Sequence, residues 1–139
     1  YGTPQRTSTG FDIRRLSMLL AVLEKRASFK LASKDVFVNI AGGLRVDEPA
    51  IDLAVISAIL SSTVDIPVDQ HTCFAGEVGL SGEVRPVSRI EQRLGEASKL
   101  GMKRILLPAF SKKRIDPARF GLEIVEISRV QQIPKYLFG

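Results

Sequence analysis

Apolar residues recur at helical spacing in three long segments of the chain. In residues 11–26 they stand at 13, 16, 19, 20 and 23, which is one face of a helix. Asp12 is placed to cap that helix, and the two basic residues at its end suit the helix dipole. Residues 50–62 are apolar on nearly every side, which predicts a helix at the centre of the fold. A third helix is expected to begin at Ser88 as its N-cap and to end at Gly101.

Short apolar runs between these helices predict strands. They are expected at residues 35–44, 73–80, 83–86, 104–107 and 122–127. The first run is apolar at both alternating sets of positions, so we expect a strand that is buried over most of its length. Ser128 is expected to cap a last short helix that ends before Pro134. With hairpin-like pieces in the first half and alternating strands and helices in the second, the order predicts a mixed α/β layer structure.

The composition indicates one globular domain and excludes several kinds of site. The chain has 139 residues, 45% of them hydrophobic and 25% charged, and its apolar runs are too short to cross a membrane. A single cysteine, Cys73, excludes an internal disulfide and any multi-cysteine metal site, and fits a reducing compartment. The single histidine, His71, is interpreted as a structural residue at a strand edge. A Ser-His-Asp triad or a histidine metal site would therefore have only this one histidine available.

The net charge of +5 is compatible with a polyanionic partner. Residues 1–10 are small, polar and turn-prone and contain no initiator methionine, so we interpret them as a linker that leads out of an upstream ATPase core. The remaining residues, 11–139, are expected to form the domain.

The stretches VDEPAIDLAV and GEVGLSGEVRPVSRIEQRLGEASKLGMKRILLP resemble the proteolytic domain of Lon-type proteases. The resemblance implies a Lon-protease-like fold of the ribosomal-protein-S5-domain-2-like type. It also places Ala50 on the position of the catalytic serine and Arg93 on that of the catalytic lysine. Alanine offers no nucleophile, and arginine, with a pKa above about 12, cannot act as a base. The resemblance therefore implies no peptidase activity.

Almost the whole chain also resembles the RadA (Sms) family of bacterial DNA repair proteins, through TGFDIRRLSMLLAVLEKRA, KDVFVNIAGGLRVDEPAIDLAV and LGMKRILLP. This implies a cytoplasmic parent that is a hexameric, RecA-like, DNA-dependent ATPase and drives branch migration in recombination. ATP, magnesium and a zinc finger are expected in that parent, and no cofactor in this domain, which has neither a P-loop nor a C-x-x-C motif. DNA, further copies of the chain and a recombinase filament are the partners implied.

Basic residues are the candidates for contact with DNA phosphates, in duplex or branched DNA. The set comprises Arg14, Arg15, Arg45, Arg85, Arg89, Arg93, Lys112, Lys113 and Arg114. Stacking on bases is less expected, because tryptophan is absent and the seven phenylalanines are interpreted as mostly core.

Each candidate also has a structural interpretation. Lys112, Lys113 and Arg114 are equally explained by a solvated loop between two strands. Arg89 and Arg93 could face phosphates or pair with Glu91 and Glu96. Arg14 and Arg15 could face DNA, a neighbouring subunit or solvent. The acidic residues at 47, 48 and 52 are interpreted as turn-forming and capping residues. A purely structural or protein-interaction scaffold without DNA contact thus stays open as an alternative.

Overall fold

The computed structural model describes residues 3–139. Its helices are α1 (Ile13–Arg26), α2 (Asp52–Val64), α3 (Ile90–Lys99) and α4 (Ile133–Phe138). Short 3-10 helices are η1 (Ala41–Gly43), η2 (Pro49–Ile51), η3 (Pro117–Phe120) and η4 (Val130–Gln132). The strands are β1 (Arg6–Thr9), β2 (Val36–Asn39), β3 (Thr72–Phe74), β4 (Glu77–Val78), β5 (Val84–Arg85), β6 (Arg104–Leu107) and β7 (Glu123–Glu126).

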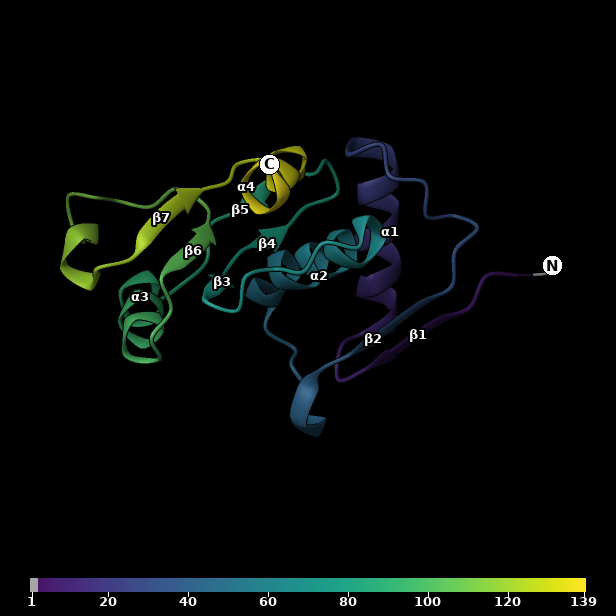
Figure 1. Cartoon of the computed structure of the whole chain (residues 1–139), viewed down its shortest axis with the longest axis horizontal. Helices are drawn as coiled ribbons and strands as arrows, with labels where there is room; N and C mark the ends of the chain where they lie inside the picture. The colour runs from purple at the N-terminus through teal and green to yellow at the C-terminus, as the bar shows by residue number, and fades with distance from the viewer. Residues whose placement is uncertain (1–2) are drawn as a thin grey trace.

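The strands form small sheets at the two ends of the molecule and one hairpin between them. Strands β3, β6 and β7 form a parallel three-stranded sheet in that order, in which Ile105 lies beside Cys73 and Ile124. Strands β1 and β2 form a separate parallel pair, and β4 and β5 an antiparallel pair. Figure 1 shows β6, β7 and α3 at one end, β1, β2 and α1 at the other, and α2 between them. The predicted mixed α/β class is confirmed.

Helix α1 begins and ends as its local sequence predicts. The Asp12 side chain accepts the Arg14 backbone N–H at 3.0 Å, which satisfies one of the free donors of the first turn. The predicted apolar stripe is buried in its central part, with Leu16, Leu19 and Leu23 fully covered. Because α1 connects β1 to β2, the two strands run parallel, and the hairpin expected in the first half is wrong.

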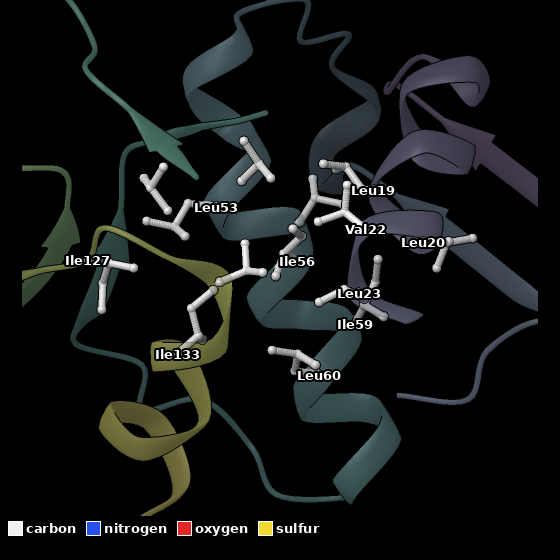
Figure 2. Close-up of a cluster of buried hydrophobic side chains, with 14 of the residues drawn as sticks. Leu19, Leu20, Val22, Leu23, Leu53, Ile56, Ile59, Leu60, Ile127 and Ile133 are labelled. Atoms are coloured by element: carbon white, nitrogen blue, oxygen red, sulfur yellow. The ribbon is translucent and has the colours of Figure 1, made fainter. Parts of the chain in front are cut away.

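Helix α2 is the central helix that the sequence predicts. It follows directly on the 3-10 turn η2, and Ala50 lies in that turn with 3% of its surface exposed. Figure 2 shows α2 between α1 on one side and the C-terminal segment on the other, with Ile56 and Leu60 pointing into the shared core. Leu53, Ile56 and Leu60 are each 0% exposed. Burial on several sides explains why this helix needs almost no polar face.

Two strand predictions are corrected in their extent and burial. The strand expected over residues 35–44 is limited to β2, and its side chains alternate between half-buried and exposed. Phe37 has 65% of its surface exposed, because alternate side chains point to opposite faces of the strand and its face is the exposed one. The strand expected over residues 73–80 is divided into β3 and β4. Gly76, between them, donates its N–H to the Ala50 carbonyl at 2.8 Å and accepts the Leu53 N–H at 3.0 Å, so the chain turns aside onto the start of α2.

The predicted ends of the last two helices also differ. Ser88 is not the N-cap of α3: Arg89 holds that position with φ 58° and no side-chain cap. The C-terminal helix does not stop before Pro134, which lies in the first turn of α4. Gln132 Oε1 accepts the N–H groups of Ser128 and Arg129, which caps the preceding 3-10 helix η4, and α4 itself has no side-chain cap. Proline suits a first turn because its missing N–H has no partner to lose.

The phenylalanines are less buried than the sequence indicates. Phe11 is fully buried, Phe37 is exposed, and the other five are half-buried. Of the segment expected as a linker, residues 1–2 lie outside the described residues, and residues 6–9 form β1. That this segment leads out of an ATPase core stays a prediction. Among residues 3–139, no helix is long and apolar enough to cross a membrane.

Candidate functional site

Ala50 occupies the helix-start position that the Lon resemblance assigns to a serine. Pro49, at the first position of η2, and the Glu48–Ile51 hydrogen bond fix this turn. The Ala50 carbonyl accepts the Gly76 N–H, so the turn is tied to the chain between β3 and β4. The position is structurally well defined, and its methyl group offers no atom that could attack a carbonyl.

Arg93, on α3, reaches back to the same turn. Its Nε donates to the Ser88 carbonyl at 2.8 Å, and a terminal nitrogen lies 3.2 Å from Glu48 Oε1. The structure thus connects the residue in the lysine position to the residue two places before Ala50. The predicted alternatives, an ion pair with Glu91 or Glu96, are wrong. Glu91 pairs instead with Arg119.

A buried ion pair stands beside this turn, where sequence reasoning placed a capping residue. Asp52 is 0% exposed, and both of its oxygens accept hydrogen bonds from Arg15, one at 2.6 Å. The Val78 N–H also donates to Asp52 at 3.0 Å. The hydrogen bond with Asp52 raises the pKa of Arg15 above its ordinary value, against the opposing effect of burial. Arg15 is therefore a structural residue that joins α1 to the start of α2.

Three of the other seven predicted DNA-contacting residues also have a carboxylate partner. Arg45 pairs with Asp47, Arg85 with Glu83 and more distantly Glu77, and Lys112 with Glu126. The cationic side chain of each pair is at least half exposed, so the pairs are weak and a phosphate could replace the carboxylate. Asp47 and Glu48, interpreted from the sequence as turn-forming and capping residues, act as ion-pair partners of Arg45 and Arg93.

Four of the predicted residues have no carboxylate partner among residues 3–139. They are Arg14, Arg89, Lys113 and Arg114, and all four side chains are exposed. Arg89 is a non-glycine residue with φ 58°, a conformation that such residues adopt with some strain.

The loop of residues 111–120 is held against α3 by its second half. Arg119 binds Glu91 at 2.6 Å, Ser98 donates its hydroxyl to the Phe120 carbonyl at 2.8 Å, and Asp116 accepts the Ala118 N–H at 3.1 Å. The first half is tied to β7 by the Lys112–Glu126 ion pair and carries Lys113 and Arg114, which make no ion pair among the described residues. This loop and α3 lie together at the end of the molecule opposite β1 and β2 (Figure 1).

The structure does not bring all the predicted residues to one surface. Arg14 lies in the first turn of α1, whereas Arg89 precedes α3 and residues 112–114 lie in the loop between β6 and η3. Figure 1 shows α1 well apart from α3. The nine predicted residues therefore divide into the group near α3, the ion-paired residues and Arg14.

His71 lies at the edge of β3, as expected. Its carbonyl accepts the N–H groups of Lys103 and Arg104, and its exposed ring stands 3.7 Å from Asp69. Among residues 3–139 no three His, Cys, Asp or Glu side chains converge on one point. These residues therefore do not fit the zinc ion that the family resemblance assigns to the parent protein.

The comparisons with known proteins agree with this domain's sequence resemblance. Residues 11–111 match the family model described as subunit ChlI of Mg-chelatase. The chain is 48% identical over 139 residues to the DNA repair protein RadA of Bacillus subtilis, of which it covers 30%. It is 45% identical over its full length to RadA of Streptococcus pneumoniae, covering 33% of that protein. Over 108 residues, 78% of this chain, it is 52% identical to RadA of Halalkalibacterium halodurans. The chain thus spans a third or less of the length of these relatives.

Proposed function

Because this chain belongs to the RadA family of DNA repair proteins, and by its family model to the ChlI group of domains, we propose that it is a DNA-binding and ring-forming module without peptidase activity. Its fold is of the Lon-protease-like type, with the serine position at Ala50 and the lysine position at Arg93. Its cellular place is the bacterial cytoplasm. ATP, magnesium and zinc act elsewhere in the parent, a hexameric ATPase that drives branch migration.

The observation that carries the DNA-binding proposal is the group of unpaired cations near α3. Arg89, Lys113 and Arg114 are exposed and have no carboxylate within an ion pair's reach among residues 3–139. Cations without an internal partner keep their full charge for an external anion. Lys112, in the same loop, adds a further contact once a phosphate replaces Glu126.

Contacts of this kind bind the phosphate backbone without reading sequence. Each phosphate that a lysine or arginine neutralises releases condensed counterions, so the affinity falls as salt rises. Such contacts position a protein on DNA and carry no base information. This suits a repair module that acts on DNA of any sequence.

The absence of peptidase activity rests on the Ala50 and Arg93 positions together. A serine–lysine dyad needs a hydroxyl nucleophile and an amine that can give up its proton. Ala50 has no hydroxyl, and the guanidinium of Arg93 is engaged with Glu48 and the Ser88 carbonyl. The two positions therefore serve the fold and its packing.

The test is equilibrium binding of this chain to a random-sequence duplex and to a four-way junction at about 50 mM and about 200 mM salt. A chain that makes about three phosphate contacts should bind roughly 40-fold more weakly at the higher salt, because the log–log slope is about −0.9 per contact. Hexamers of the full-length protein that form normally while this chain binds neither DNA at low salt would contradict the proposal and favour the structural scaffold.

A further inference from the structure

An apolar groove runs along the edge of β2 that faces away from β1. Its volume is about 570 Å³. One wall is β2 together with Ile40, which follows it. The other wall is a single face of α2 together with Ile51, which precedes it. That face repeats at helical spacing, at positions 51, 54–55, 58–59 and 62–63. The α2 surface is thus continuous along the groove.

The β2 edge in this groove has free backbone hydrogen-bonding groups. Val36 and Ile40 donate their N–H groups toward β1, to Gln5 and Thr9 at 2.8 and 2.9 Å. Because successive residues of a strand point their N–H and C=O groups to opposite edges, those of Phe37 and Asn39 point into the groove. Among residues 3–139 no strand pairs with this edge.

The side chains around the edge are apolar where a covering strand would meet them. Phe37 is 65% exposed, and Ala58, on the facing helix, is exposed as well. Small side chains at positions 54, 58 and 62 of α2 leave room for a backbone to approach the helix. An open apolar strand edge is a site of strand addition, and a pair of strands such as β1–β2 is marginal by itself.

We propose that this groove receives an additional β-strand supplied by the same polypeptide, from the part of the full-length protein that lies outside these 139 residues. The chain covers 30% to 33% of its full-length RadA relatives, so about two thirds or more of each lies beyond the matched region. A segment in the same polypeptide has a high effective concentration at the groove, so a short strand suffices. A strand of about five residues extends β1–β2 to three strands. Its apolar side chains alternate, with one set packed on α2.

This occupant accounts for the groove better than a second copy of β2. A copy paired antiparallel about Phe37 would bring Lys34 opposite Ile40 and Asp35 opposite Asn39, so neither charge would meet an opposite charge across the pair. In such a pair, the four-residue β2 of each copy would have to cover the α2 face of the other copy while it already lies beside its own α2. A strand of different sequence can both avoid these unmatched charges and pack its own apolar side chains on α2.

The test is hydrogen exchange of the full-length protein, resolved at the amides of Phe37, Asn39 and Ile40. Ile40 is the internal reference, because its N–H already bonds to Thr9. We expect Phe37 and Asn39 to be protected at least about 100-fold over an unstructured peptide, close to the protection of Ile40. Exchange of Phe37 and Asn39 at the unstructured rate, with Ile40 protected, would overturn the proposal.

A matched pair of variants keeps the test specific to the groove. Ala58→Arg places a charge on the exposed groove face of α2, and Ala109→Arg places the same charge on an exposed residue outside the groove. Ala58→Arg should lower the protection of Phe37 and Asn39 at least tenfold and leave Ile40 unchanged, whereas Ala109→Arg should change none of the three. Equal protection in both variants would contradict an occupied groove.

Cross-linking at Lys34, at the end of the groove, identifies the source of the strand. Ordinary and heavy-nitrogen full-length chains are mixed, assembled together and treated with a lysine-reactive cross-linker. Links from Lys34 to residues outside this domain should stay within one isotope. Links that join the two isotopes would show that a neighbouring copy supplies the strand and would overturn the proposal. None of these readouts depends on DNA binding.

Discussion

Arg15 on α1 and Asp52 on α2 form a two-pronged ion pair, in which the aspartate is completely buried and the arginine side chain is 28% exposed. The pair joins residues 37 positions apart and fixes the start of α2, because Asp52 also accepts the Val78 N–H. The turn that carries Ala50 is thereby held from both α1 and β4.

Removing one partner of this pair should destabilise the chain strongly. Arg15→Ala leaves a buried carboxylate without its counter-charge, and we expect a loss of about 3 kcal/mol in the free energy of unfolding. Urea unfolding measures it, with Arg14→Ala as the matched control, since the neighbouring Arg14 is exposed and unpaired among residues 3–139. The control should stay within about 0.5 kcal/mol of the unmodified chain. Equal effects of the two substitutions would contradict a structural role for Arg15.

Glycine at position 76 is required by close packing. A Cβ there would lie 2.9 Å from Val84 Cγ1 and 3.1 Å from Leu53 Cδ2. Gly76→Ala should therefore cost about 1–3 kcal/mol in the free energy of unfolding. Gly95→Ala is the control with the opposite sign: a Cβ in α3 meets Phe120 at an ordinary 3.8 Å, so the helix should gain about 0.5–1 kcal/mol. A neutral Gly76→Ala would show that the contact between this turn and α2 is loose.

Features that depend on neighbouring residues were predictable from the sequence. The Asp12 cap, the buried stripe of α1 and the central place of α2 all follow from spacing and capping chemistry within one helix. The strand β6 is equally local, since a short apolar run ended by proline has few alternatives.

Features that depend on distant residues were not predictable. The exposure of Phe37 depends on which face of β2 the rest of the fold covers, which the apolar pattern of its segment does not reveal. The left-handed Arg89 displaces the cap from Ser88, although serine is the better capping residue, because the path of the chain between β5 and α3 decides it. The pair of Arg93 with Glu48 spans 45 positions, so the sequence offered only the nearby Glu91 and Glu96 as possible ion-pair partners.

Restoring the two Lon-type residues should not restore proteolysis. In Ala50→Ser with Arg93→Lys, the new amine lies near Glu48, whose carboxylate favours the protonated form that cannot act as a base. We expect casein hydrolysis indistinguishable from that of the unmodified chain. A triple variant that also carries Glu48→Gln lacks this carboxylate. It is the control that tests whether Glu48 is what keeps the new amine protonated. Turnover by the double variant in proportion to its concentration would contradict the account.

Cys73 should react slowly with alkylating reagents. Burial raises the pKa of the Cys73 thiol, and the thiol donates a hydrogen bond to the Arg104 carbonyl at 3.6 Å. Since the thiolate is the reactive form, iodoacetamide at about pH 8 should modify the folded chain more slowly than the chain unfolded in urea. Equal rates in the two states would show that the thiol is freely exposed and ionises normally.

The salt dependence of DNA binding in single variants tests the central claim most directly. Arg89→Ala, Lys113→Ala and Arg114→Ala are each titrated on two duplexes of unrelated sequence, beside the control Lys30→Ala, an exposed lysine outside the α3 group. Each of the three should reduce the log–log salt slope by about 0.9 and weaken both duplexes equally, because it removes one phosphate contact and no base contact. The control should keep the slope of the unmodified chain. If all three variants keep that slope and affinity as well, the residues near α3 are ordinary surface charge and the proposed DNA surface is wrong.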